Sequence, residues 1–140
     1  MFGIFVTRHA SQSRIIEDNP SEGVLLLATE MERKDLIPFI RLTIPLMVLD
    51  SYFPMQKCDS VLTDNHEDSY AAVRHIIDHD HDKIGYLHSS IWINNFDERM
   101  EGFIKAMTDF SLKPSKKYIL NLESTIDRYY PDMTNLLSQI

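Results

Sequence analysis

Short apolar runs recur along this chain, and most of them do not alternate apolar with polar residues. The runs are Phe2–Val6, Val24–Ala28, Leu46–Leu49, Ile84–Leu87 and Tyr118–Leu122. Continuous apolar runs of this length are typical of strands that are buried on both faces. Segments with helical periodicity lie between several of the runs, which favours a parallel sheet with crossover helices. We therefore predict an α/β fold built from doubly wound parallel sheets.

Two segments carry the clearest helical pattern. Between Ser69 and Asp80 one apolar stripe follows a 3.6-residue repeat and is expected to pack on the sheet. Its members are Ala72, Val73, Ile76 and Ile77. A second helix is predicted over residues 96–110, where Asn95 and Glu98 have the spacing of a capping pair.

The composition limits both the size of the fold and the class of partner. A chain of 140 residues with 44% hydrophobic residues is long enough for one real core. Its formal net charge of −7 repels a phosphate backbone, so we expect no nucleic-acid binding by this chain alone. The lone Cys58 cannot form an internal disulfide, and no apolar run is long enough for a membrane span. We therefore expect a cytoplasmic protein.

Histidines gather near the end of the first predicted helix. His75 and His79 are four positions apart, a spacing that can place two imidazoles on one metal ion. A solvated helix end that runs into a turn explains the same residues, and no motif supplies a third ligand. We predict no metal site and no cofactor, and only four glycines are present, so no glycine-rich phosphate loop is available.

Acidic side chains and an imidazole crowd the strand-to-helix junction at residues 63–69. They are Asp64, His66, Glu67 and Asp68. Carboxylates in a first helical turn offset the helix dipole, and either Asp64 or Asn65 can cap the helix. Paired carboxylates can also serve acid–base catalysis. Because open α/β sheets bind ligands beyond the carboxyl ends of their strands, we expect ligand binding here rather than catalysis.

Arg99 is the most informative side chain in the sequence. It follows Asn95 by four positions, so both can project from one side of the helix start. The positive end of the helix dipole disfavours a cation in the first helical turn, so the presence of Arg99 there needs an explanation. Either a neighbouring carboxylate pairs with Arg99, or its guanidinium fork is directed at a polar ligand. Trp92, in the preceding loop, can stack on a sugar ring or cover the edge of the core.

Five motifs, in order and spacing, carry a family resemblance. They are Gly23-Val-Leu-Leu-Leu, Ile44-Pro-Leu-Met-Val-Leu-Asp50, Val61-Leu-Thr-Asp-Asn65, His81-Asp-Lys-Ile-Gly-Tyr-Leu87 and Glu98-Arg-Met-Glu-Gly-Phe103. Over about residues 23–123 the chain resembles the effector-binding domain of the lac repressor/galactose repressor (LacI/GalR) family of bacterial transcriptional regulators, whose fold is similar to that of periplasmic sugar-binding proteins.

The resemblance implies a two-lobed sensor that binds a small molecule, usually a sugar or a sugar derivative, between its lobes. Closure would control operator DNA through a helix-turn-helix segment that is absent from this chain, in a homodimer that is not an enzyme. By motif matching, Arg99 falls on the family's effector-contacting arginine, Asn95 on a nearby polar contact, and Glu67 on an acidic contact of some members. Residues 1–83 would supply part of the N-terminal lobe and residues 84–140 the start of the C-terminal lobe.

The chain departs from the family pattern at several points. Asp80 stands where the family usually has a glycine before its histidine, and Asp68 occupies another customary glycine position. Aspartate adopts the left-handed conformation less easily than glycine. The DNA-binding headpiece, the first strand and helix, and the later strands of the family have no counterpart here. We therefore expect the chain to be part of a longer protein, with an incomplete effector pocket.

Two other functions remain open from the sequence. A free-standing solute-binding protein would have the same fold without any DNA output. A small α/β hydrolase would use the acidic junction Asp64–Asp68 with His66 as its base. The resemblance favours the sensor of a transcriptional regulator over both.

Overall fold

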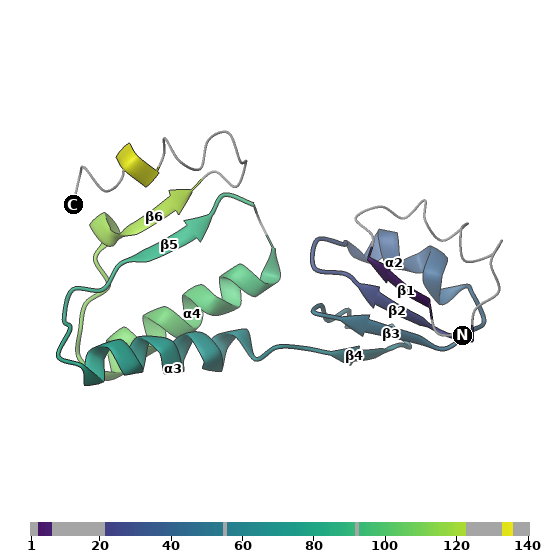
Figure 1. Cartoon of the computed structure of the whole chain (residues 1–140), viewed down its shortest axis with the longest axis horizontal. Helices are drawn as coiled ribbons and strands as arrows, with labels where there is room; N and C mark the ends of the chain where they lie inside the picture. The colour runs from purple at the N-terminus through teal and green to yellow at the C-terminus, as the bar shows by residue number, and fades with distance from the viewer. Residues whose placement is uncertain (1–2, 7–21, 55, 92, 123–132, 136–140) are drawn as a thin grey trace. The chain divides into compact units, whose positions relative to one another are not determined.

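The computed structural model describes residues 3–6, 22–54, 56–91, 93–122 and 133–135. The chain divides into two compact units, Met1–Thr63 and Asp64–Ile140, and each unit has its own sheet (Figure 1). Within the described residues, no helix has the length and the apolar character that crossing a membrane requires.

The first unit contains a parallel sheet with the strand order β1-β2-β3-β4. Its strands are β1 (Gly3–Val6), β2 (Val24–Leu27), β3 (Leu46–Leu49) and β4 (Asp59–Val61). Every neighbouring pair of these strands is parallel. Helix α2 (Arg33–Ile40) connects β2 to β3. The predicted α/β class and the parallel pairing are confirmed.

Alternate residues of β2 and β3 build the core of the first unit with α2. Leu26 and Val48 are fully buried, and α2 adds Leu36 and Phe39. Because successive side chains of a strand point to opposite faces, Val24 joins Leu26 on the α2 side of the sheet.

The second unit contains two helices and a two-stranded parallel sheet. Helix α3 (Asn65–Asp78) and helix α4 (Asn94–Asp109) lie side by side, and α4 contacts β5 (Figure 1). The strands are β5 (Tyr86–Ser89) and β6 (Ile119–Leu122), with the short 3-10 helix η2 (Lys116–Tyr118) before β6. Their core consists of Val73, Ile84, Phe103, Ala106 and Met107.

The division between the units lies one helix earlier than the lobe boundary that the sequence suggests at residues 83 and 84. The family resemblance places the residues of α3 with the strands before them, because its lobe boundary follows residue 83. In the structure, Val73 of α3 packs with Phe103 and Met107, so α3 belongs to the second unit. Which lobe of the family each unit corresponds to remains a prediction.

The buried face of α3 is narrower than predicted. Val73 is buried and Ile77 packs against the core, as expected. Ala72 is exposed and Ile76 is 37% exposed, so the predicted stripe is wrong for these two residues. Tyr70 replaces them, because it lies one turn before Val73 on the same side of the helix.

Helix α3 ends in a Schellman motif that contains a strained aspartate. The amide of Asp80 donates to the carbonyl of Ile77, and the amide of His81 donates to the carbonyl of Ile76. Asp80 has a φ of 63°, in the left-handed region that glycine adopts without strain. The departure from the family's glycine therefore has a conformational cost.

We expect Asp80→Gly to raise the free energy of unfolding by about 0.5–1 kcal/mol, because relief of the left-handed strain exceeds the added entropy of the unfolded chain. Urea denaturation of the two proteins measures the difference. Asp82→Gly is the control, since Asp82 is not among the residues with positive φ and should lose stability. Equal or lower stability of Asp80→Gly would contradict the argument.

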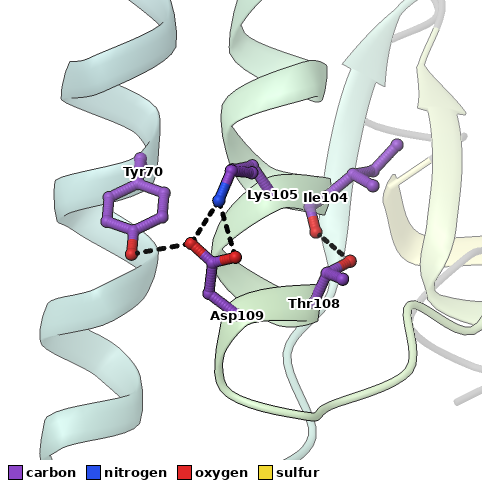
Figure 2. A network of polar contacts seen from close by, with 5 residues as sticks. All are labelled: Tyr70, Ile104, Lys105, Thr108 and Asp109. Atoms are coloured by element: carbon purple, nitrogen blue, oxygen red, sulfur yellow. Dashed lines mark hydrogen bonds and ion pairs between the residues drawn. The ribbon is translucent and has the colours of Figure 1, made fainter.

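A polar cluster joins α3 to α4 on the surface of the second unit (Figure 2). The hydroxyl of Tyr70 donates to Oδ2 of Asp109 at 3.1 Å, and Lys105 Nζ donates to both carboxylate oxygens at 2.6 and 2.5 Å. The Lys105 ammonium lowers the pKa of Asp109, whereas partial burial and the bond to Asp109 raise the pKa of Tyr70. This cluster fixes the pairing of the helices away from their N-termini.

Candidate functional site

The N-terminus of α3 is capped by Asp64. Its Oδ1 accepts a hydrogen bond from the amide of Glu67 at 3.0 Å. Of the two capping candidates, the structure therefore selects Asp64, and Asn65 becomes the first residue of the helix. Glu67 lies exposed in the first turn, where its charge complements the helix dipole.

Helix α4 begins at Asn94, and no side chain caps it. The predicted capping pair of Asn95 and Glu98 is wrong, because Asn95 already lies inside the helix and is 7% exposed. The earlier start also moves Arg99 into the second turn. The helix dipole therefore opposes its charge less than the sequence suggested, since the effect fades within the first turn.

Four polar side chains, which we call the N-terminal network, connect the starts of α3 and α4. They are Asn65, Asn94, Glu98 and Arg99. Arg99 Nε donates to Asn65 Oδ1 at 2.7 Å, and Asn65 Nδ2 donates to Glu98 Oε2 at 3.1 Å. Asn94 Nδ2 donates to the other oxygen of Glu98 at 2.7 Å. Donors and acceptors alternate along the whole network.

Arg99 is exposed, yet two neighbours restrain it. Besides the Asn65 bond, its Cζ lies 5.9 Å from the centre of the Phe96 ring. Among the described residues, no carboxylate oxygen forms an ion pair with Arg99. Of the two explanations that the sequence left open for Arg99, a salt bridge to a neighbouring carboxylate is therefore not what holds this side chain. A neutral amide holds it instead, through the Nε–H donor of the guanidinium.

Close packing of the two helices creates this arrangement. Gly102 of α4 lies so near the carbonyl oxygen of His66 that a Cβ there would clash with it. Ser69 Oγ donates to the carbonyl of Arg99 at 2.7 Å, which ties the same turns together. Glycine thus allows the helix approach that brings Asn65 within reach of Arg99.

The structure treats the four predicted site residues differently. Arg99 and Asn95 lie on the first two turns of α4, and Glu67 lies in the first turn of α3, close to the Asn65 that binds Arg99. Trp92 lies outside the described residues. Asn95 is buried, so it can contact a ligand only through what little of it is exposed. The role of these residues in binding remains a prediction.

Sequence reasoning missed Asn65 as a functional residue and considered it only as a cap. It is 3% exposed, which is unusual for an asparagine. Its signal in the sequence is its place directly after Asp64, at the junction between a strand and the helix that follows it. Since either Asp64 or Asn65 can cap the helix, the sequence alone does not show that the Asn65 amide is available for a contact with another helix.

In the histidine pair at the end of α3, the two rings lie against each other, and one ring nitrogen contacts a backbone carbonyl. The ring centres of His75 and His79 lie 4.3 Å apart, and His79 Nδ1 lies 2.7 Å from the carbonyl oxygen of His75. Over the described part of the chain, no three metal-ligating side chains cluster around a common point.

Known proteins resemble this chain in sequence. It is 30% identical over 116 residues to the HTH-type transcriptional repressor PurR of Actinobacillus pleuropneumoniae serotype 5b (strain L20), covering 83% of this chain and 34% of that protein. It is 28% identical over 118 residues to PurR of Glaesserella parasuis serovar 5, covering 84% and 35%. No family model matches the chain.

Solved structures share its fold. A LacI-family transcriptional regulator from Burkholderia phymatum superposes with a TM-score of 0.75 at 18% identity, covering 92% of this chain and 47% of that one. In sequence the chain is similar to PurR repressors, and in fold to regulators of the LacI family. A sugar-binding transcriptional regulator of this family from Escherichia coli, complexed with phosphate, gives a TM-score of 0.73 at 21% identity, covering 95% and 50%. The chain spans about a third of the length of its LacI/GalR relatives named PurR.

Proposed function

We propose that this chain is an effector-sensing part of a LacI/GalR transcriptional regulator. It binds a small molecule, a sugar or a sugar derivative, and controls operator DNA through a helix-turn-helix segment outside this sequence. The proposal rests on the position of the Arg99 guanidinium. The side-chain amide of Asn65 holds this charged group near the N-terminal ends of α3 and α4. The names of the relatives as transcriptional repressors support the regulatory role, and one structural neighbour is described as sugar-binding.

The ligand contacts that we propose are Arg99, Asn95, Glu67 and Trp92. Arg99 donates to ligand oxygens, and the Glu67 carboxylate accepts from ligand hydroxyls. The step is binding without covalent chemistry, and the effector acts by stabilising one conformation of the regulator over another. The net charge of −7 agrees with DNA contacts made by a different segment. A homodimer in the cytoplasm completes the proposal, since operator half-sites commonly mirror a two-fold protein.

Thermal unfolding in the presence of aldoses, phosphorylated aldoses and nucleobases tests this function. A compound present at a hundred times its Kd should stabilise the wild type by about 2.7 kcal/mol, which raises Tm by several degrees. Arg99→Ala should weaken that compound about tenfold or more, because a charge-assisted hydrogen bond is lost.

Arg74→Ala is the matched control. Arg74 is also an exposed arginine, and it pairs with Asp78 of its own helix at 4.0 Å, so its loss should leave the ligand shift unchanged. The absence of any shift across the panel, or equal shifts in wild type and Arg99→Ala, would refute the proposed function.

A further inference from the structure

We propose that Asn65 is a positioning residue for effector recognition: it fixes Arg99 through Nε and thereby leaves the terminal guanidinium edge and its full charge to the ligand. The inference rests on the proposed function for its biological meaning. Its geometric content concerns the second unit alone and can be tested without knowing the effector.

The amide of Asn65 has a defined orientation. The side chain is 3% exposed, so water is a poor substitute for protein partners. Its oxygen accepts from Arg99 Nε, and its nitrogen donates to Glu98 Oε2. Rotating the amide by 180° would place its nitrogen against the Arg99 donor and its oxygen against the Glu98 acceptor. Glu98 therefore orients Asn65, and Asn65 orients Arg99.

The choice of an amide over a carboxylate has a consequence for binding. A carboxylate beside Arg99 can accept two parallel hydrogen bonds from the guanidinium and neutralise its charge. The single oxygen of Asn65 accepts the Nε–H donor and carries no charge. The terminal amino groups keep their donors, and the Phe96 ring, 5.9 Å from Cζ, restrains the side chain further. Arg99 is therefore held in one orientation, and its terminal guanidinium nitrogens remain charged donors for a ligand.

Two readouts on the full chain test this arrangement. Proton exchange at the Arg99 Nε–H, followed by ¹⁵N NMR and assigned with Arg99→Lys, reports the bond to Asn65. Phenylglyoxal modification, followed by peptide mass spectrometry, reports access to the terminal guanidinium nitrogens, which are the atoms that this reagent attacks. Neither readout needs an effector.

In the wild type we expect slow Nε–H exchange together with rapid modification of Arg99. Asn65→Ala should speed exchange about tenfold or more, because the acceptor is lost, while modification stays rapid. Asn65→Asp is compatible with a helix N-terminus. In this variant Nε–H exchange should stay slow, while the rate of phenylglyoxal modification should fall about tenfold, because the carboxylate binds the terminal guanidinium nitrogens of Arg99. A merely structural role for Asn65 would not separate the two readouts in this way.

Asn94→Ala is the matched control, because Asn94 also donates to Glu98 but is not the acceptor of the Arg99 Nε–H, and both readouts should stay at the wild-type values. Unchanged exchange in Asn65→Ala, or equal modification in wild type and Asn65→Asp, would overturn the positioning role. Asn65→Asp keeps the test valid where Asn65→Ala does not fold. Failure of every panel compound to bind would instead refute the proposed function, since the two Arg99 readouts do not depend on it.

Discussion

Replacing Gly102 with alanine is expected to lower the free energy of unfolding by about 2 kcal/mol or more. A Cβ at this position would clash with the carbonyl oxygen of His66 and lie 3.1 Å from Cβ of Ser69. The obstacle is backbone, so no side-chain rotation relieves it, and α3 and α4 must separate. Overpacking of this kind costs about 1–3 kcal/mol and occasionally more, which exceeds the ~1 kcal/mol that alanine gains over glycine in a helix.

The same substitution should weaken the N-terminal network. Separation of the helices lengthens the bond from Ser69 to the Arg99 carbonyl and the bond from Arg99 to Asn65. We therefore expect faster exchange of the Arg99 Nε–H as well as a lower midpoint in urea denaturation.

Gly85→Ala is the comparison variant for Gly102→Ala. A Cβ at Gly85 would lie 3.3 Å from the carbonyl oxygen of Tyr118, a tight contact that a small shift relieves. Its destabilisation should be clearly smaller. If Gly102→Ala instead stabilised the chain, helix propensity would outweigh packing, and the close approach of α3 and α4 would be wrong.

Local apolar pattern was enough to predict most strands and both long helices. The runs at Val24, Leu46 and Tyr118 became β2, β3 and the η2–β6 segment, because a continuous apolar run has few alternatives to a buried strand. Strand β4 (Asp59–Val61) lacks such a run, and its side chains are largely exposed. Only its pairing with β3 makes it a strand, and pairing is not visible in a single sequence.

The candidate site was predicted in part. The sequence drew attention to Arg99 because its charge appeared to conflict with a helix dipole, although that helix in fact begins earlier. What holds Arg99 comes from α3, which is distant in the sequence, and no local pattern reveals such a contact. Asn65 and Ser69 therefore emerged only when the packing of the two helices was known.

Truncation of Phe103 to alanine should destabilise the second unit by about 3–5 kcal/mol, as is usual for a buried phenylalanine. Phe103 is 1% exposed, and its ring centre lies 5.1 Å from that of Tyr86 in a tilted arrangement. It joins helix α4 to strand β5, so the cavity would form at the centre of the core. Phe110, 37% exposed just after α4, is the same residue type at the surface, and Phe110→Ala should cost far less.

Hydrogen exchange read by mass spectrometry should locate the effect of Phe103→Ala. The first unit has a separate core that includes Phe39, which is 1% exposed. We expect Phe103→Ala to remove protection from α3, α4, β5 and β6 while β2 and β3 stay protected, and Phe39→Ala to give the opposite pattern. Equal loss of protection in both units would show that they unfold as one cooperative body. Effector binding to the second unit could then not be separated from the stability of the first, because the ligand would stabilise both together.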